Sequence, residues 1–332
     1  MDETEKRIAF GPVPSRRLGR SLGINNIPPK ICTYSCVYCQ LGKTHHVQTS
    51  REPFYSPVEI RKAVEKTVRE TLKRQEHIEY LTFVPDGEPT LDNNLGDTIV
   101  TCRQLGIKTA VITNASLLWQ EEVRRDLLNS DYVSLKIDAV HEDIWRRINR
   151  PSKSVQLDTV LEGIIDFSHE FTGKLVTETM LIHTLNDTLQ ELTDIASFIA
   201  KVHPQTSYIA LPIRPPAEKW VQTPDEKTIT MAHEIFRKKS LPVEYLIGYE
   251  GNTFASTGNP REDILNITMV HPMKQEAIQE VLKKARKKWD VIETLLSEKK
   301  LVEIIYNKET FYLRKLPHHK KKDCSCIKKG TA

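Results

Sequence analysis

The sequence predicts an α/β fold in which a partial or complete parallel (β/α) barrel precedes a small C-terminal winged-helix-like domain. Three observations lead to this prediction. Short β-branched runs alternate with helical patterns through most of the 332 residues. The alternation stops at a loop-like stretch, 248–260, which contains three glycines. The remaining chain is long enough only for a small appendage to one large domain.

The barrel prediction rests on the order of the expected elements. The expected strands are residues 22–27, 78–84, 108–112, 132–137, 175–182, 207–213 and 243–247. The expected helices are 57–73, 93–105, 118–128, 154–167, 188–201 and 225–237. Strands and helices at this spacing favour βαβ units and a parallel sheet. An open doubly wound sheet is the alternative that spacing alone leaves open.

A different pattern follows the loop-like stretch. Helical patterns at 273–285 and 289–296 precede two strand-like segments, 301–306 and 309–313. Helices followed by a hairpin suggest a winged-helix-type module. We therefore divide the chain into a barrel domain (1–260), a winged-helix-like domain (261–316) and a basic, flexible tail (317–332).

Charge is unevenly distributed along the chain. The formal net charge is +4, but residues 272–332 contain 16 Lys or Arg and 8 Asp or Glu, a net charge of +8. Such a basic segment suits contact with phosphate backbones, and a solvated, solubilising tail is the alternative. No run of 18 apolar residues predicts a membrane span, and residues 1–7 lack the apolar core of a signal peptide. We therefore expect a cytoplasmic protein that has no membrane partner.

The cysteines give the strongest chemical signal. Three of the six, Cys32, Cys36 and Cys39, fall within eight residues. In a reducing cytoplasm, such a group more often binds metal than forms disulfides. Thiolates are the usual ligands of iron–sulfur clusters, and three thiolates leave one iron of a [4Fe–4S] cluster open to another molecule. A zinc site completed by His45 or His46 is the alternative.

The other three cysteines are weaker candidates for metal binding. Cys102 lies in an expected helix and is expected to be a small core residue. A second metal site on His318, His319, Cys324 and Cys326 remains open, because their spacing is loose.

A second candidate motif, Gly87-Glu88, follows the expected strand 78–84. A glycine permits close approach of the backbone to a ligand, and an adjacent carboxylate can accept hydrogen bonds from an ammonium group. A plain turn after a strand is the alternative.

Polar residues also end the next two expected strands. Thr113 and Asn114 follow one strand, and Ser134, Lys136 and Asp138 alternate along the other. Period-two alternation places these three on one face, and catalytic residues of such sheets lie at the carboxyl ends of strands. A buried, structurally paired Lys136–Asp138 is the alternative.

The cysteine spacing, with Tyr38 before the last cysteine, resembles the signature of the radical SAM superfamily. The resemblance implies that Cys32, Cys36 and Cys39 hold a [4Fe–4S] cluster whose open iron binds S-adenosylmethionine (SAM). It also implies that a one-electron reductant such as a ferredoxin or flavodoxin reduces the cluster. Reductive cleavage of SAM then gives a 5′-deoxyadenosyl radical that abstracts a hydrogen atom from a substrate.

The resemblance also implies roles for the other candidates. Gly87 and Glu88 match the motif that holds the methionyl amino group, with Asp86 where many members have a small residue. Thr113, Asn114 and Ser134 are implied contacts of SAM, and Lys136 and Asp138 are implied catalytic residues.

Four segments indicate a particular group within this superfamily. Residues 11–23, 136–138, 147–151 and 214–220 resemble a radical SAM group related to the wyosine-forming tRNA enzymes, and the likeness extends over residues 10 to 250. Those enzymes carry a second cluster on additional N-terminal cysteines, but no cysteine precedes Cys32 here, so the wyosine reaction itself is not implied. The resemblance and the basic tail favour an RNA substrate. A cluster-containing sensor that binds nucleic acid without catalysis is the alternative.

Overall fold

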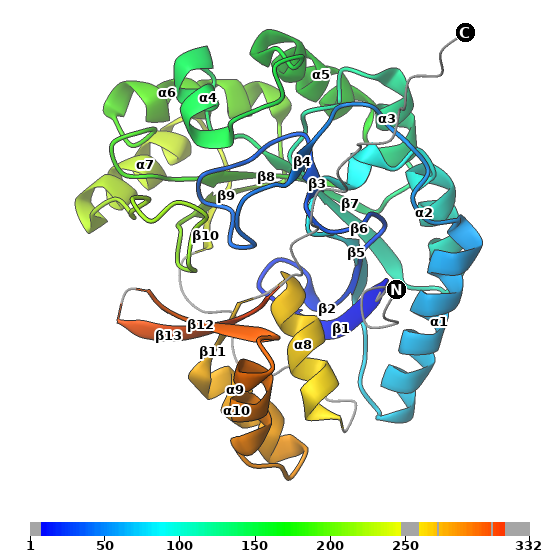
Figure 1. The fold of residues 1–332 in the computed structure, drawn as a ribbon. Coiled ribbons are helices and arrows are strands. Elements are labelled where there is room, and N and C mark those ends of the chain that lie inside the picture. The colour runs from blue at the N-terminus through cyan, green and yellow to red at the C-terminus, as the bar shows by residue number, and fades with distance from the viewer. Residues whose placement is uncertain (1–7, 247–258, 271, 307, 316–332) are drawn as a thin grey trace, which may run out of the picture.

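A curled, eight-stranded sheet dominates the computed structural model, which describes residues 8–246, 259–270, 272–306 and 308–315 (Figure 1). The basic tail and its His and Cys residues lie outside the described residues. The strand order is β1-β2-β5-β6-β7-β8-β9-β10. β1 runs antiparallel to β2, and all other neighbours are parallel.

The bounds of the strands in this sheet are β1 (Ala9–Ser15), β2 (Gly19–Ile24), β5 (Tyr80–Phe83), β6 (Lys108–Thr113), β7 (Tyr132–Lys136), β8 (Lys174–Met180), β9 (Thr206–Ala210) and β10 (Val243–Leu246). The parallel strands follow one another in chain order without reversal. The parallel barrel is therefore confirmed as a partial barrel, and the doubly wound alternative is wrong.

Helices cover the outer face of this sheet. They are α1 (Pro57–Lys73), α2 (Leu95–Arg103), α3 (Glu121–Leu127), α4 (Glu142–Asn149), α5 (Leu157–Glu170), α6 (Leu189–Val202) and α7 (Glu226–Lys238). Their apolar faces form one hydrophobic core with the outward-facing residues of the strands, such as Val133 and Leu135. None of the helices in the described ranges is long and apolar enough to cross a membrane.

Helix α1 illustrates why these segments are helical. The side chain of Ser56 caps the helix by accepting from the Glu59 backbone N–H, and Pro57 occupies the first turn, where its missing N–H costs nothing. Ile60, Val64 and Val68 recur every four residues and are buried, so one face of the helix packs on the sheet.

The C-terminal part has its own hydrophobic core. It contains α8 (Pro260–Val270), β11 (Met273–Lys274), α9 (Gln275–Lys284), α10 (Asp290–Ser297), β12 (Leu301–Tyr306) and β13 (Glu309–Arg314). Its strands form a small sheet of order β11-β13-β12. This part packs beside β1, where Val13 joins its core, near the open side of the partial barrel (Figure 1).

Candidate active site

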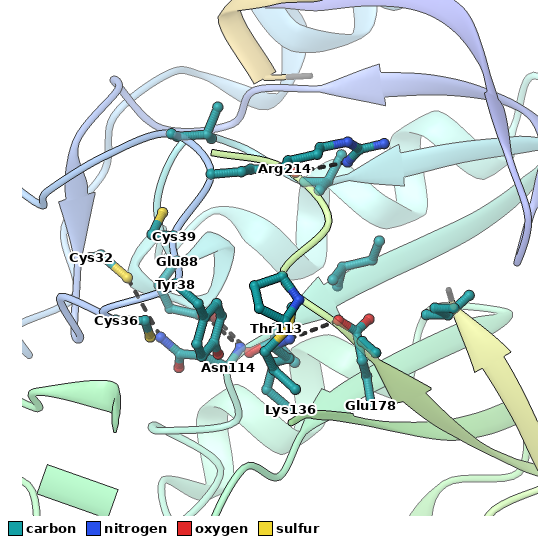
Figure 2. Close-up of a pocket in the computed structure, with 18 of the residues that line it drawn as sticks. Cys32, Cys36, Tyr38, Cys39, Glu88, Thr113, Asn114, Lys136, Glu178 and Arg214 are labelled. Carbon is teal, nitrogen blue, oxygen red and sulfur yellow. Dashed lines mark hydrogen bonds and ion pairs between the residues drawn. The ribbon is translucent and has the colours of Figure 1, made fainter. Parts of the chain in front are cut away.

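A cavity of about 290 Å³ opens where the parallel strands end (Figure 2). Most of the residues singled out from the sequence line it. They are Cys32, Cys36, Cys39, Gly87, Glu88, Thr113, Asn114 and Lys136. The sequence motifs, which are up to 104 positions apart along the chain, therefore meet at one place. Ser134 and Asp138 do not line this cavity and are described below.

The three cysteine thiols lie along one side of the cavity, and amide groups support two of them (Figure 2). Asn114 Nδ2 donates to Cys32 Sγ at 3.5 Å, and Asn149 Nδ2 donates to Cys36 Sγ at 3.4 Å. Burial raises the pKa of the Cys36 thiol to about 12 and also raises the pKa of Cys32 and Cys39. Iron binding deprotonates thiols, and N–H donors to sulfur favour the thiolate form, so this donor set fits a cluster.

The described residues contain no set of three or more His, Cys, Asp or Glu side chains arranged to hold one metal ion. A [4Fe–4S] cluster makes a different demand, because each thiolate binds a different iron and the sulfur atoms need not converge on one point.

The cysteine loop is closed at its base by a short parallel pair and a buried ion pair. The pair consists of β3 (Ile31–Cys32) and β4 (His46–Val47). Lys30 Nζ lies 3.1 Å from Asp86 Oδ2 and also donates to the Leu41 carbonyl. The Lys30 backbone N–H donates to the Asp86 carbonyl at 2.7 Å. Lys30 thus connects both ends of the cysteine loop, and its contacts with Asp86 tie them to the loop after β5.

Gly87 is required by this contact between the two loops. A Cβ at this position would lie 1.9 Å from the Ile31 backbone oxygen. The next residue, Glu88, donates its backbone N–H to the same oxygen at 3.1 Å. We expected the glycine to let the backbone approach a ligand; the close approach that the structure shows is to the cysteine loop.

The Glu88 carboxylate is held rigidly at the wall of the cavity. Its Oε1 accepts from the Thr113 hydroxyl at 2.6 Å and from both the hydroxyl and the N–H of Thr90. Its Oε2 accepts from the Asn114 N–H at 2.8 Å. Burial raises the pKa of Glu88, and these donors oppose the rise. With one donor, Oε2 retains capacity to accept another hydrogen bond.

Lys136 faces the cavity from the end of β7 and pairs with β8 (Figure 2). Its Nζ lies 2.7 Å from Glu178 Oε1 and 4.8 Å from the centre of the Tyr38 ring. The second oxygen of Glu178 pairs with Arg17, which also donates to Ser134 Oγ at 3.4 Å. Glu178 is therefore shared by two cations, and the partner of Lys136 is Glu178 rather than Asp138.

Neighbouring charges determine the ionisation states of Arg17, Lys136 and Glu178. Burial alone would raise the pKa of Glu178, but Arg17 and Lys136 hold it at about 2. Burial alone would lower the pKa of Lys136, but Glu178 and Asp138 raise it above its ordinary value. All three groups are therefore charged at neutral pH.

Asp138 lies behind the wall of the main cavity, where it lines a smaller one. Its carboxylate accepts from the Tyr38 hydroxyl, from Asn149 Nδ2 at 2.8 Å and from the Met180 N–H at 2.9 Å. Asn149 is also the donor to Cys36. Asp138 therefore positions Tyr38, which lies in the cysteine loop, and Asn149, which donates to Cys36.

Several cavity residues have no role in the sequence-based prediction. Arg17 and Arg16 lie in the turn between β1 and β2, and Arg16 Nη2 donates to the Leu246 carbonyl at 3.1 Å. Arg214 follows β9 and donates to Gln40 Oε1 at 2.7 Å. The family resemblance includes segments 11–23 and 214–220, which contain these arginines, and that is the one sequence signal that could have found them.

Comparisons with known proteins identify relatives of this chain. A family model described as Radical SAM superfamily matches residues 26–199. A UPF0026 protein of Methanocaldococcus jannaschii is 46% identical over 311 residues, which cover 93% of this chain and 96% of that protein. A UPF0026 protein of Synechocystis sp. is 35% identical over 62% of this chain and 76% of that protein.

Two solved structures share the fold. A radical SAM methyltransferase from Sphaerobacter thermophilus has a TM-score of 0.53 at 15% identity, covering 69% of this chain and 67% of that chain. Streptococcus suis SuiB bound to S-adenosylmethionine has a TM-score of 0.51 at 13% identity, covering 68% of this chain and 50% of that chain. At these identities the likeness shows the fold alone.

Proposed function

The chain belongs to the radical SAM superfamily, whose members use a [4Fe–4S] cluster and SAM, and we propose that it abstracts a hydrogen atom from a substrate in its cavity. The observation that carries this proposal is the joint positioning of three cysteine thiols and Glu88 on one cavity wall. The Ile31 carbonyl connects them, since it accepts from the Glu88 N–H and directly precedes Cys32.

The residues divide the work as follows. Cys32, Cys36 and Cys39 hold the cluster, which, when bound, supplies the electron that cleaves SAM. Glu88 accepts from the methionyl ammonium through Oε2, because Oε1 already receives three donors. Asn114 orients this region by donating to both Glu88 and Cys32. The one-electron reductant is a ferredoxin or flavodoxin.

Anaerobic reconstitution tests the proposal. The wild-type chain should bind about four irons and, with SAM and a strong reductant, release 5′-deoxyadenosine and methionine. The variant with Cys32, Cys36 and Cys39 all changed to Ala should lose both. Cys102→Ala is the matched control, because Cys102 is buried on α2, away from the cavity.

Two outcomes would contradict the proposal. A full cluster in the triple variant would place the cluster elsewhere. A cluster-loaded wild type with no SAM affinity would favour the sensor without catalysis.

The substrate that we propose is RNA, docked by the C-terminal part. Its order of helix, strand, two helices and hairpin, with sheet order β11-β13-β12, supports our proposal of a winged-helix-like module. Five basic residues lie within six positions, at the end of α9 and in the turn to α10. They are Lys283, Lys284, Arg286, Lys287 and Lys288, and all are exposed.

The basic turn suits phosphate contact better than base reading. Helix α10, which would enter a groove in such a module, begins with acidic residues, Asp290 and Glu293. The turn instead borders a cleft lined by Lys283, Lys287 and Trp289. Lysines beside an aromatic ring are typical of surfaces that bind single strands.

Salt dependence tests this docking. Affinity for RNA should fall with salt with a slope of about −0.7 for each phosphate contacted on a single strand. Changing the five basic residues to Gln should weaken binding and flatten the slope. The control changes Arg237, Lys238 and Lys239, which are exposed at the end of α7. If the wild type binds no RNA at low salt, the docking proposal is wrong.

A further inference from the structure

Asn149 is a buried residue that contacts the cysteine loop through both its backbone and its side chain. It ends α4 and is 3% exposed. Its backbone carbonyl accepts from the Ser35 N–H at 3.0 Å, and the carbonyl of Ile148 accepts from the Val37 N–H at 2.9 Å. Because Ser35 and Val37 flank Cys36, the end of α4 fixes the backbone on both sides of this cysteine.

The side chain of Asn149 bridges a thiol and a carboxylate. Its Nδ2 donates to Cys36 Sγ at 3.4 Å and to Asp138 Oδ2 at 2.8 Å. An amide nitrogen carries two hydrogen atoms, so these two acceptors account for both of them. Asn149 thus places one polar donor between two groups that would repel each other when both are charged.

Asp138 determines which end of this amide faces the sulfur. A side-chain amide has a donor at one end and an acceptor at the other, and its orientation follows from its partners. A carboxylate only accepts, so Asp138 selects the nitrogen end of Asn149. The Tyr38 hydroxyl and the Met180 N–H hold this carboxylate in turn. Since both bonds leave from the same nitrogen, turning the amide over would point its oxygen at Cys36.

A donor in this position acts on the charge of an iron–sulfur cluster. Reduction adds one negative charge, part of which lies on the sulfur ligands, so an N–H donor to sulfur stabilises the reduced state more than the oxidised state. The site is buried, which strengthens this interaction. Asn149 lines the smaller cavity together with Asp138 and Trp145, whereas the SAM that we propose occupies the main cavity.

We propose that Asn149 is a positioning residue that raises the reduction potential of the cluster through its hydrogen bond to Cys36, while Asp138 holds the amide in the donating orientation. This inference rests on the function proposed above, because it takes Cys36 as a ligand of the cluster. The hydrogen bond makes the cluster easier for its one-electron reductant to reduce.

A redox titration of the reconstituted protein, followed by electron paramagnetic resonance without SAM, measures this potential. Asn149→Leu keeps the approximate size of the side chain and removes its N–H groups, while Asp138 retains the donors from Tyr38 and Met180. The ratio of reduced to oxidised cluster at a fixed potential should fall about tenfold, the size of one net hydrogen bond. For a one-electron couple this is a drop of about 59 mV. Asn149→Ala should shift the potential in the same direction.

Thr44→Val is the matched control. The Thr44 hydroxyl donates to the Tyr34 carbonyl at 2.7 Å, so it holds the same loop through an oxygen rather than a sulfur. Its loss should leave the potential at the wild-type value. Iron content of every variant is measured alongside.

Three results would overturn the proposal. They are a wild-type potential in both Asn149 variants, an equal drop in Thr44→Val, and loss of iron from both Asn149 variants alone, which would show that Asn149 only holds the loop. Because the potential is measured without SAM, a cluster-loaded wild type that releases no 5′-deoxyadenosine would count against the proposed function alone.

Discussion

Replacing Glu178 by Gln removes a carboxylate that Arg17 and Lys136 share, while keeping the size of the side chain. Its side chain is 10% exposed, so solvent cannot replace the lost charge. The two cations would then lie beside a neutral amide in place of the carboxylate that both contact. We expect the variant to fold with a clear loss of stability at neutral pH.

The magnitude follows from the pKa of Glu178, which falls from 4.5 to about 2 on folding. That fall corresponds to about 3 kcal/mol of stabilisation. Breaking a buried ion pair by removing one partner costs about 3–5 kcal/mol, so the two lines of reasoning agree in order of magnitude. Because folding depresses this pKa, the stabilisation is complete above the unfolded value of 4.5 and is lost as pH falls towards 2.

Urea unfolding of the cluster-free protein checks the prediction. At pH 7 the free energy of unfolding of the wild type should exceed that of Glu178→Gln by about 3 kcal/mol. This difference should narrow steadily as pH falls below about 4.5. Glu234→Gln is the control, since Glu234 pairs with Arg237 on the exposed surface of α7 and should change little. Equal stability at pH 7, or a gap that stays constant on acidification, would refute the reasoning.

Two further predictions concern the base of the cysteine loop. Gly87→Ala should lower iron content and SAM affinity together, because its Cβ would meet the Ile31 oxygen at 1.9 Å and force the two loops apart. The control is Gly106→Ala, which strains the backbone at a φ of +73° but has no atom within 4 Å of the added carbon, so its iron and SAM binding should match those of the wild type. Equal iron and SAM binding by the two variants would contradict the steric argument. Asp86→Asn should cost about 3–5 kcal/mol in urea unfolding, because it leaves Lys30 buried without its charged partner. The double variant Lys30→Met, Asp86→Leu should recover part of that loss, and a double variant less stable than Asp86→Asn would show that the charge is not the cause.

The sequence was sufficient to predict the parallel strands and their order along the chain. Each is a short β-branched run followed by a helical pattern, and both signals are local. Strand β1 was not predicted, because Pro12 and Pro14 lie within it. It is an edge strand, and an edge is where a sheet tolerates proline. Helix α8 was not predicted either, because its apolar residues do not form one clear stripe.

The limits of period-two reasoning are visible on β7. Ser134 and Lys136 share a face, as predicted, and both contact the Arg17–Glu178 pair. Asp138 was expected on the same face, but β7 ends at Lys136, so the alternation no longer applies two residues later. The chain turns there towards α4, where Asp138 meets Asn149.

The Arg17–Glu178 pair could not be predicted from local patterns, since the two residues are 161 positions apart. Nothing in the neighbourhood of either residue specifies the other. Only the curl of the sheet, which brings the first hairpin to the ends of the later strands, places them together. The charge of a cavity is a property of the fold, whereas the cysteine spacing is a property of one loop.

Tyr38 is visible both in the local sequence pattern and in the long-range contacts of the fold. The sequence gives it as the aromatic residue before Cys39, and the structure shows what each part of its side chain contacts. Its hydroxyl donates to Asp138, and its ring lies under the Lys136 ammonium group at 4.8 Å. A ring in this position favours the charged form of Lys136. Tyr38 therefore links the cysteine loop to Asp138 and Lys136, so a change at either residue is expected to alter the position of the loop.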